Sequence, residues 1–297
     1  MRAANLCRTF VGWLVLLSVA AVGRGADPLT ERARDVLRRA FQEEKGWTRI
    51  HAAEALLVVS DAETVRKEFG EPVAAEGARP ERIGIWRVRA ALAQTPEERT
   101  RWVRQIEAVA VDAAAKDQLQ GIESLAKLGE RPGAAVLAAA HRLAEKGDAE
   151  SLYPMWLEHL AGDTGAVKRI ARRLSSPVPA ARLRAAYVLR KIKPDDPEVR
   201  QALAHAAGSE PPETMAYPFV LGAALLLGAD PAQAAGWRAT LEKLATTSAA
   251  GARYEADQVL MQVRPAPDEA LFRPGLDGTG DVRIGAAWAI LALAGRR

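Results

Sequence analysis

The first side chains with a type and spacing suited to chemistry are His51 and Glu54. They are three residues apart, so on a helix they would share one face, as in half of a carboxylate–histidine metal site. The sequence has no second Glu-x-x-His pair, and the other histidines (His141, His159, His205) lack a carboxylate at ligand spacing. We therefore expect a solvated helix face here and no metal site.

Other motifs of catalysis or cofactor binding are incomplete or missing. The run DGTGD at 277–281 lacks the third alternating acid and the distal Glu of a calcium loop, and it predicts a turn with Asp281 as a helix N-cap. No G-x-S-x-G elbow and no glycine-rich phosphate loop occurs. The sequence thus predicts a protein that is not an enzyme and that carries no cofactor.

Aromatic side chains in the first half of the chain are the candidates for a binding site. Trp86, Trp102, Tyr153, Trp156 and His159 could come together in one groove if consecutive helical units stack. Tryptophan and tyrosine are enriched at binding hot spots. Tyr153 and Trp156 also have the spacing of an ordinary core stripe, so core packing is the preferred alternative.

The elements that position these side chains are predicted to be helices. Nearly half of the residues are hydrophobic, and most of these are Ala, Leu and Val, whereas aromatics make up 5%. Such a composition favours helix over sheet. The clearest helix is 176–192, where a serine and prolines begin a run of apolar residues at helical spacing.

Variants of this helix recur along the chain. Their first polar residues fall at 49, 82, 118, 150, 182, 213, 253 and 283, with an average step of about 33 residues, as in repeats of two stacked helices. The clearest copies have Ala or Gly three positions later, in the pairs Arg49 and Ala52, Gln118 and Gly121, Arg182 and Ala185, Arg253 and Ala256, and Arg283 and Ala286. A helical pair cannot bury its apolar stripe alone, so neighbouring pairs must stack.

The chain resembles a bacterial HEAT-repeat protein, of the short HEAT-like kind also found in phycobilin lyases. The matching residues are DVRIGAAWAIL at 281–291, with 182–189 and 49–56 as further matches, and the resemblance covers most of residues 30–295. It implies an all-α superhelix, a HEAT-like α-solenoid of about eight helical pairs. It also implies that the arginines bond to neighbouring turns and that Ala-Ala pairs pack helix on helix.

The N-terminus resembles a secretory signal. Arg2 and Arg8 precede a short apolar run, and small residues follow at 23–26. We therefore divide the chain into a signal peptide, 1–26, and a helical repeat domain, 27–297. An uncleaved anchor is the alternative, and it would be the one contact with a membrane. Cys7, the only cysteine, would be lost on cleavage.

Charge and fold together limit the partners. Removal of residues 1–25 leaves 38 basic against 37 acidic residues, which is not the footprint of a nucleic-acid-binding protein. We expect an exported, periplasmic or extracellular scaffold that presents a curved helical surface to a protein partner. The alternative is an enzyme or cofactor carrier on an α/α scaffold, resembling a bilin lyase or a polysaccharide-processing enzyme. That alternative requires acids, histidine or tyrosine to converge in one cavity.

Overall fold

The computed structural model describes residues 27–69, 76–228 and 230–296. These ranges are helical and contain no β-strand, which confirms the all-α prediction. The expected signal peptide, 1–26, lies outside the described residues. None of the helices in the described ranges is both long and apolar enough to span a bilayer.

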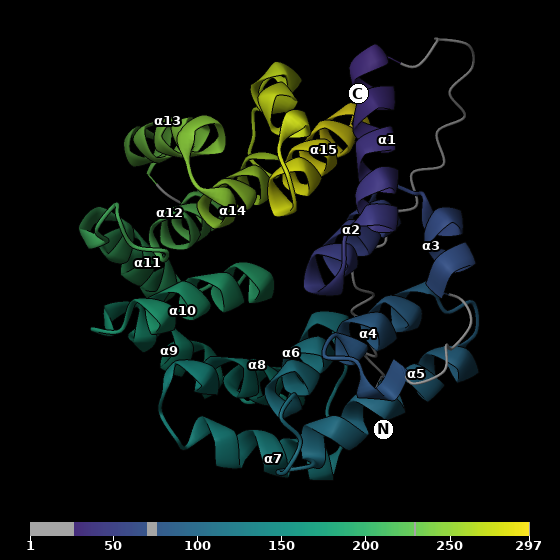
Figure 1. The fold of residues 1–297 in the computed structure, drawn as a ribbon. Coiled ribbons are helices and arrows are strands. Elements are labelled where there is room, and N and C mark those ends of the chain that lie inside the picture. The colour runs from purple at the N-terminus through teal and green to yellow at the C-terminus, as the bar shows by residue number, and fades with distance from the viewer. Residues whose placement is uncertain (1–26, 70–75, 229, 297) are drawn as a thin grey trace, which may run out of the picture.

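The helices form two concentric layers around a common axis (Figure 1). The inner layer consists of α2 (Gly46–Val58), α4 (Arg82–Leu92), α6 (Gln118–Leu128), α8 (Leu152–Ala161), α10 (Pro179–Ile192), α12 (Tyr217–Leu226), α14 (Ala250–Leu260) and α15 (Asp281–Ala294). The outer layer consists of α1 (Pro28–Glu43), α3 (Ala62–Phe69), α5 (Pro96–Val111), α7 (Ala134–Ala144), α9 (Gly165–Arg172), α11 (Pro197–Ser209), α13 (Pro231–Thr247) and the 3-10 segment η4 (Glu269–Asp277). Three short 3-10 turns adjoin them, η1 (Glu76–Ala78), η2 (Ala149–Ser151) and η3 (Arg173–Ser175). The eight inner helices coincide with the eight copies found in the sequence.

The first and last helical pairs pack against each other, so the array closes into a ring. Helix α15 contacts α14 on one side and both α1 and α2 on the other. It is apolar almost all round, with Ile284, Ala287 and Leu291 buried, and such a helix must be covered on every side. The two ends of the helical array therefore meet at α15.

The small residues of the repeat lie where helices approach most closely. Ala52, Ala185, Ala256 and Ala286 are fully buried. A Cβ atom at Gly121 would lie 3.2 Å from the backbone nitrogen of Ala110 on the preceding outer helix. This confirms that these positions serve helix packing.

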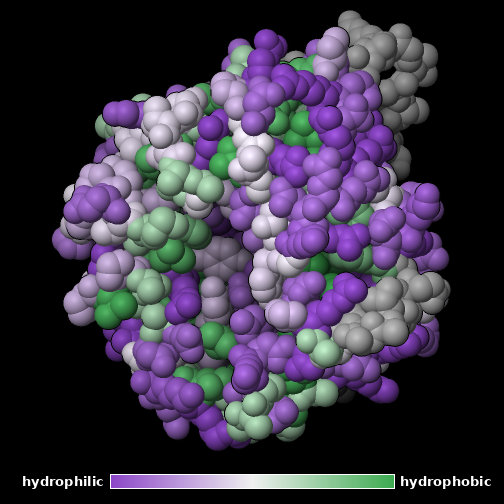
Figure 2. Space-filling model, viewed as in Figure 1, coloured by the Kyte–Doolittle hydropathy of each residue, from purple (hydrophilic) through white to green (hydrophobic). Residues whose placement is uncertain are grey.

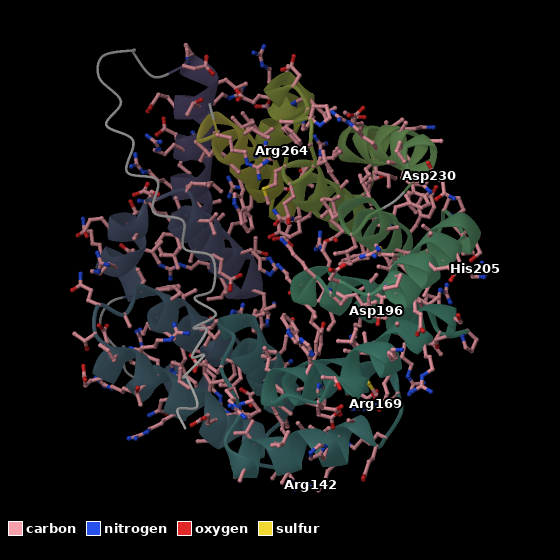
Figure 3. The ribbon with its side chains drawn as sticks, turned by 180° about the vertical axis from the view of Figure 1, so that it is seen from behind. Arg142, Arg169, Asp196, His205, Asp230 and Arg264 are labelled. Atoms are coloured by element: carbon pink, nitrogen blue, oxygen red, sulfur yellow. The ribbon has the colours of Figure 1, made fainter. Side chains whose placement is uncertain are left out.

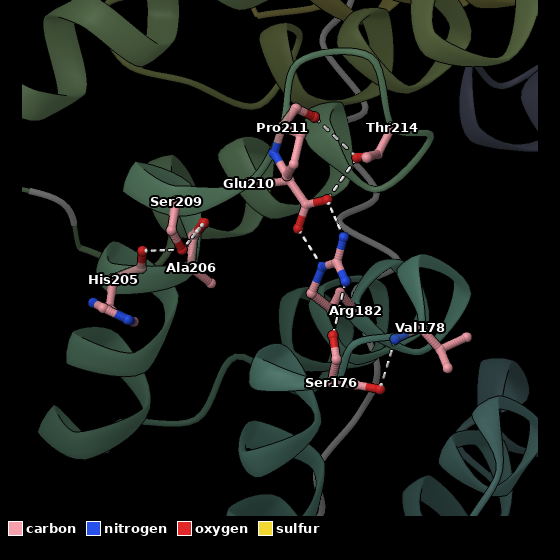
Figure 4. Close-up of polar contacts among 9 residues, drawn as sticks. All are labelled: Ser176, Val178, Arg182, His205, Ala206, Ser209, Glu210, Pro211 and Thr214. Carbon is pink, nitrogen blue, oxygen red and sulfur yellow. Dashed lines mark hydrogen bonds and ion pairs between the residues drawn. The ribbon is translucent and has the colours of Figure 1, made fainter.

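Two of the arginines at the first position of the repeat bind a backbone carbonyl shortly before their own helix. Arg182 donates from Nη1 to the Ser176 carbonyl at 2.7 Å, and its Nε and Nη2 donate to the two carboxylate oxygens of Glu210 at 2.6 and 2.7 Å (Figure 4). Arg49 likewise donates to the Phe41 carbonyl at 2.9 Å. The turn-bonding role is thus confirmed for Arg49 and Arg182. Arg253 differs, because its buried Nε and Nη2 make no hydrogen bond within the described ranges.

Candidate functional site

Polar side chains from the inner helices meet inside the ring. Lys127 on α6 has its Nζ 5.7 Å from the ring centroid of Tyr187 on α10, and Arg190 on α10 lies 2.8 Å from Glu255 on α14. Each contact passes over the inner helix that lies between the two, α8 and α12 respectively. Figure 2 shows this face hollowed near its middle. We call the surface inside the ring the lumen, and its polar and aromatic residues are His51, Glu54, Arg87, Glu123, Lys127, Tyr153, Trp156, Arg184, Tyr187, Arg190, Lys191, Tyr254, Glu255 and Asp281.

Arg87 links three consecutive inner helices on the lumen side. Its Nε donates to Glu54 on α2 at 2.7 Å, and its Nη1 donates to the Ser124 hydroxyl on α6 at 2.7 Å. Burial alone would raise the pKa of Glu54, but the Arg87 guanidinium lowers it below its usual value. Glu54 is therefore an ion-paired carboxylate facing the lumen, and the expected freely solvated face is not observed.

Tyr187 is the centre of a cationic and aromatic cluster. Its ring centroid lies 5.7 Å from Lys127 Nζ, 6.0 Å from Arg190 Cζ and 5.6 Å from Lys191 Nζ. The rings of Tyr153 and Trp156 on α8 contact it edge-on, at 6.4 and 6.3 Å. Burial raises the pKa of Tyr187 although Lys127 lies beside it, so the phenol stays protonated at neutral pH.

Lys191 has an unusual environment within this cluster. Its side chain is exposed to solvent and at the same time lies against the Tyr187 ring, close to Arg190 and Lys127. Burial, together with the charges of Arg190 and Lys127, lowers the pKa of Lys191 to about 8. Two like charges close to a lysine disfavour its protonated form.

Two acids on α14 are buried near the lumen. Glu255 pairs with Arg190, and both side chains are 5% exposed. Burial raises the pKa of Glu255 in spite of that partner. Asp257 is 1% exposed, and neither of its carboxylate oxygens has a hydrogen-bond partner among the described residues. Burial raises the pKa of Asp257 well above its ordinary value.

A histidine–aspartate pair lies where the ring closes. His51 Nδ1 on α2 is 2.9 Å from Asp281 Oδ1 on α15, and the Tyr254 ring on α14 stacks on the imidazole at 5.7 Å. Asp281 is the first residue of α15 and does not cap it, because the N-cap position is occupied by Gly280. The expected N-cap role is therefore wrong, and the carboxylate binds the histidine instead.

The five aromatic and histidine residues selected from the sequence do not share one surface. Trp86 and Trp102 are 7% and 5% exposed, and Arg82 and Arg89 lie over their respective rings. Tyr153 and Trp156 meet at Tyr187, whereas His159 has a buried Nδ1 without a hydrogen bond in the described part of the chain. Burial lowers the pKa of His159. A role in binding stays a prediction for each of them, and only Tyr153 and Trp156 lie in the lumen.

The remaining histidines do not assemble a metal site. His141 Nδ1 lies 2.6 Å from Glu158, which also binds Arg169 at 2.6 Å. His205 lies on α11 at the outer rim of the ring (Figure 3). Within the described ranges, no group of three or more histidine, cysteine or acidic side chains could hold a metal ion.

The repeat register contains a signal for the lumen that motif searching does not use. Four of the lumen residues, Glu54, Arg87, Glu123 and Tyr187, lie five positions after the first polar residue of their copies. Six of the eight copies carry a polar or aromatic residue there, namely Glu54, Arg87, Glu123, Tyr187, Gln258 and Trp288. Such residues are unexpected at one fixed position in buried helices, so the alignment of the copies could have revealed the lumen.

Comparison of the sequence with known proteins assigns no family. No protein-family model matches the chain, and no curated protein matches it. Functional inference therefore depends on the site itself.

Proposed function

We propose that this protein is a non-catalytic binding module that holds a protein partner at its lumen. The observation that carries this proposal is the convergence of Tyr153, Trp156 and Tyr187 with lysine and arginine side chains inside the ring. Aromatic residues and arginine are the types that dominate binding energy at interfaces. The carboxylates Glu54 and Glu255 are engaged by arginine at 2.6 and 2.8 Å, which favours a structural role for them over proton transfer.

The fold and location belong to the same proposal. We regard the ring as a HEAT-like superhelix that closes after a single turn, which replaces the open concave surface with an enclosed one. The basic, then apolar, N-terminus supports export to the periplasm or the extracellular space, where the scaffold would meet its partner. Mass spectrometry of the protein from its native envelope tests export, because a chain that still begins at residue 1 in the cytoplasm would contradict it.

The experiment uses a photo-crosslinking amino acid at two positions in the full chain. One variant carries it at Glu123 in the lumen, outside the residues expected to bind an anion, and the matched control carries it at Arg142 on the outer layer (Figure 3). We expect a partner to be crosslinked in native envelopes from position 123 and not from position 142. Crosslinking from the outer position alone, or from neither, would contradict the proposal.

A second candidate is an enzyme, and the His51–Asp281 pair is the observation that favours it. A carboxylate that holds Nδ1 leaves Nε2 as the site that accepts a proton, so the pair could serve as a general base for glycan processing. His51→Gln would then abolish turnover of an acidic glycan while the helical circular dichroism stays unchanged. Equal glycan turnover by wild type and His51→Gln would exclude this candidate, as would the absence of turnover by wild type.

A further inference from the structure

Two cations on α10 flank Tyr187 on the lumen side. Arg184, Tyr187 and Lys191 are spaced by three and four residues, so they form one stripe along the helix. Seven residues of helix place the two cations about 10 Å apart along the axis. Arg184 lies over the Tyr153 ring at 5.7 Å and Lys191 over the Tyr187 ring at 5.6 Å. These contacts position the cations without neutralising them.

Neither of these two cations has an anionic partner. Among the described residues, Arg184 and Lys191 make no ion pair, whereas Lys127 pairs with Glu123 at 2.9 Å and Arg190 pairs with Glu255 at 2.8 Å. With the Arg87–Glu54 pair included, five cations face three carboxylates in this part of the lumen. A cleft lined by an excess of one sign of charge attracts ions of the opposite sign.

A buried and unsatisfied donor lies in the same cluster. Arg190 is 4% exposed, and its Nη1 has no hydrogen-bond partner in the described ranges, although a buried N–H of a charged group is costly to leave unpaired. The guanidinium lies 6.0 Å from the Tyr187 centroid, on the ring that Lys127 and Lys191 also approach. Arg190 and Lys191 therefore both border the Tyr187 ring, and Arg184 borders the Tyr153 ring that contacts it.

We propose that the Arg184–Tyr187–Lys191 stripe binds carboxylate side chains of an acidic segment in the partner, an inference that rests on the proposed binding function. The separation of about 10 Å corresponds to roughly three residues of extended peptide, so one segment reaches both cations. Tyr153 and Trp156 supply apolar surface for its remaining atoms. A nucleic acid fits less well, because the near balance of basic and acidic residues gives no extended positive field.

The test is isothermal titration calorimetry of the full chain with hexaglutamate, at low salt and pH 7. We expect binding that weakens about tenfold or more in Lys191→Met and in Arg184→Gln. The matched control Arg142→Gln removes a cation from the outer layer and should bind like wild type. Circular dichroism shows whether each variant folds. If Lys191→Met does not fold, Lys191→Gln takes its place. Binding by wild type should also fall as the pH rises above about 8.

Other outcomes overturn the assignment. Equal affinity of wild type and both stripe variants would show that the stripe does not bind the peptide. Tighter binding of inorganic phosphate or polygalacturonate than of hexaglutamate would assign the stripe to a different anion. Crosslinking of a partner from position 123 without a stripe effect would retain the proposed function and reject this inference. Absence of both the crosslink and the stripe effect would reject the proposed function and this inference together.

Discussion

Asp281 Oδ1 lies 2.9 Å from His51 Nδ1, although 230 residues separate them in the chain. Arg283 supports the same junction, since it donates to Glu44 at 2.8 Å and to Glu43 at 3.1 Å. Arg32 and Asp277 form a further ion pair there. The ring is thus closed by polar contacts as well as by the apolar faces of α1 and α15.

Replacing Arg283 should loosen this junction. In Arg283→Met the two glutamates lose a charged donor, and we expect the free energy of unfolding to fall by about 1–3 kcal/mol. Hydrogen exchange should become faster in α1 and α15, with α6 to α8 unchanged. Arg66→Met is the control, because its pair with Glu63 is exposed and worth little. A uniform increase over all helices would contradict a local junction.

Arg182 should be intolerant of lysine. Glu210 is 1% exposed at its side chain and receives two hydrogen bonds from the Arg182 guanidinium, which a single ammonium group cannot reproduce. We expect Arg182→Lys to cost about 1–3 kcal/mol in urea unfolding. Arg182 and Thr214 hold the pKa of Glu210 below its usual value against the effect of burial, so this stabilisation is present above pH 4.5 and is lost as acid protonates the folded state. An unchanged acid transition in Arg182→Met would contradict the assignment.

Lys191 should make the stability of the protein increase at alkaline pH. Its pKa is about 8 in the folded chain and 10.5 as the ordinary value. Between these values the unfolded chain holds the proton and the folded chain does not, so the free energy of unfolding rises with pH. We expect wild type to gain stability relative to Lys191→Met from pH 8 to 10.5, measured by parallel urea titrations. A constant difference between the two proteins would show an ordinary lysine.

Two glycines in the third quarter of the ring should respond to alanine in opposite ways. A Cβ atom at Gly222 on α12 would lie 2.3 Å from Val259 on α14, so Gly222→Ala should destabilise by about 1–3 kcal/mol through overpacking. Gly236 is exposed within α13 and has no atom within 4 Å of such a Cβ. Gly236→Ala should therefore stabilise by up to about 1 kcal/mol. Thermal unfolding of both variants checks this, and equal shifts would contradict the packing of α12 on α14.

The repeat was predictable because packing constrains it at every copy. The small residues at Ala52, Gly121 and Ala185 mark close helix approaches, and the arginines at Arg49 and Arg182 mark the turns. Each of these signals arises within a single helical pair. They recur at fixed spacing and are therefore visible in the sequence.

Closure of the ring was not predictable from those signals. It depends on the small rotation between successive pairs, which accumulates over the whole chain and has no local sequence mark. The meeting of His51 with Asp281 follows only once the ring is closed. This is why His51 resembles an exposed side chain in the sequence, whereas it has a partner on α15. The partner of Glu54 lies on the adjacent inner helix α4 and requires only the packing of neighbouring pairs.

Fluorescence energy transfer between dyes on α1 and on the loop before α15 tests ring closure most directly. Gln42 and Thr279 are exposed and flank the contact between Glu44 and the Gly280 amide, and the chain from residue 27 contains no other cysteine. With cysteines at both positions, the closed ring predicts nearly complete transfer. An open stack of eight pairs would separate the dyes by about 60 Å or more, and the weak transfer that results would contradict the ring.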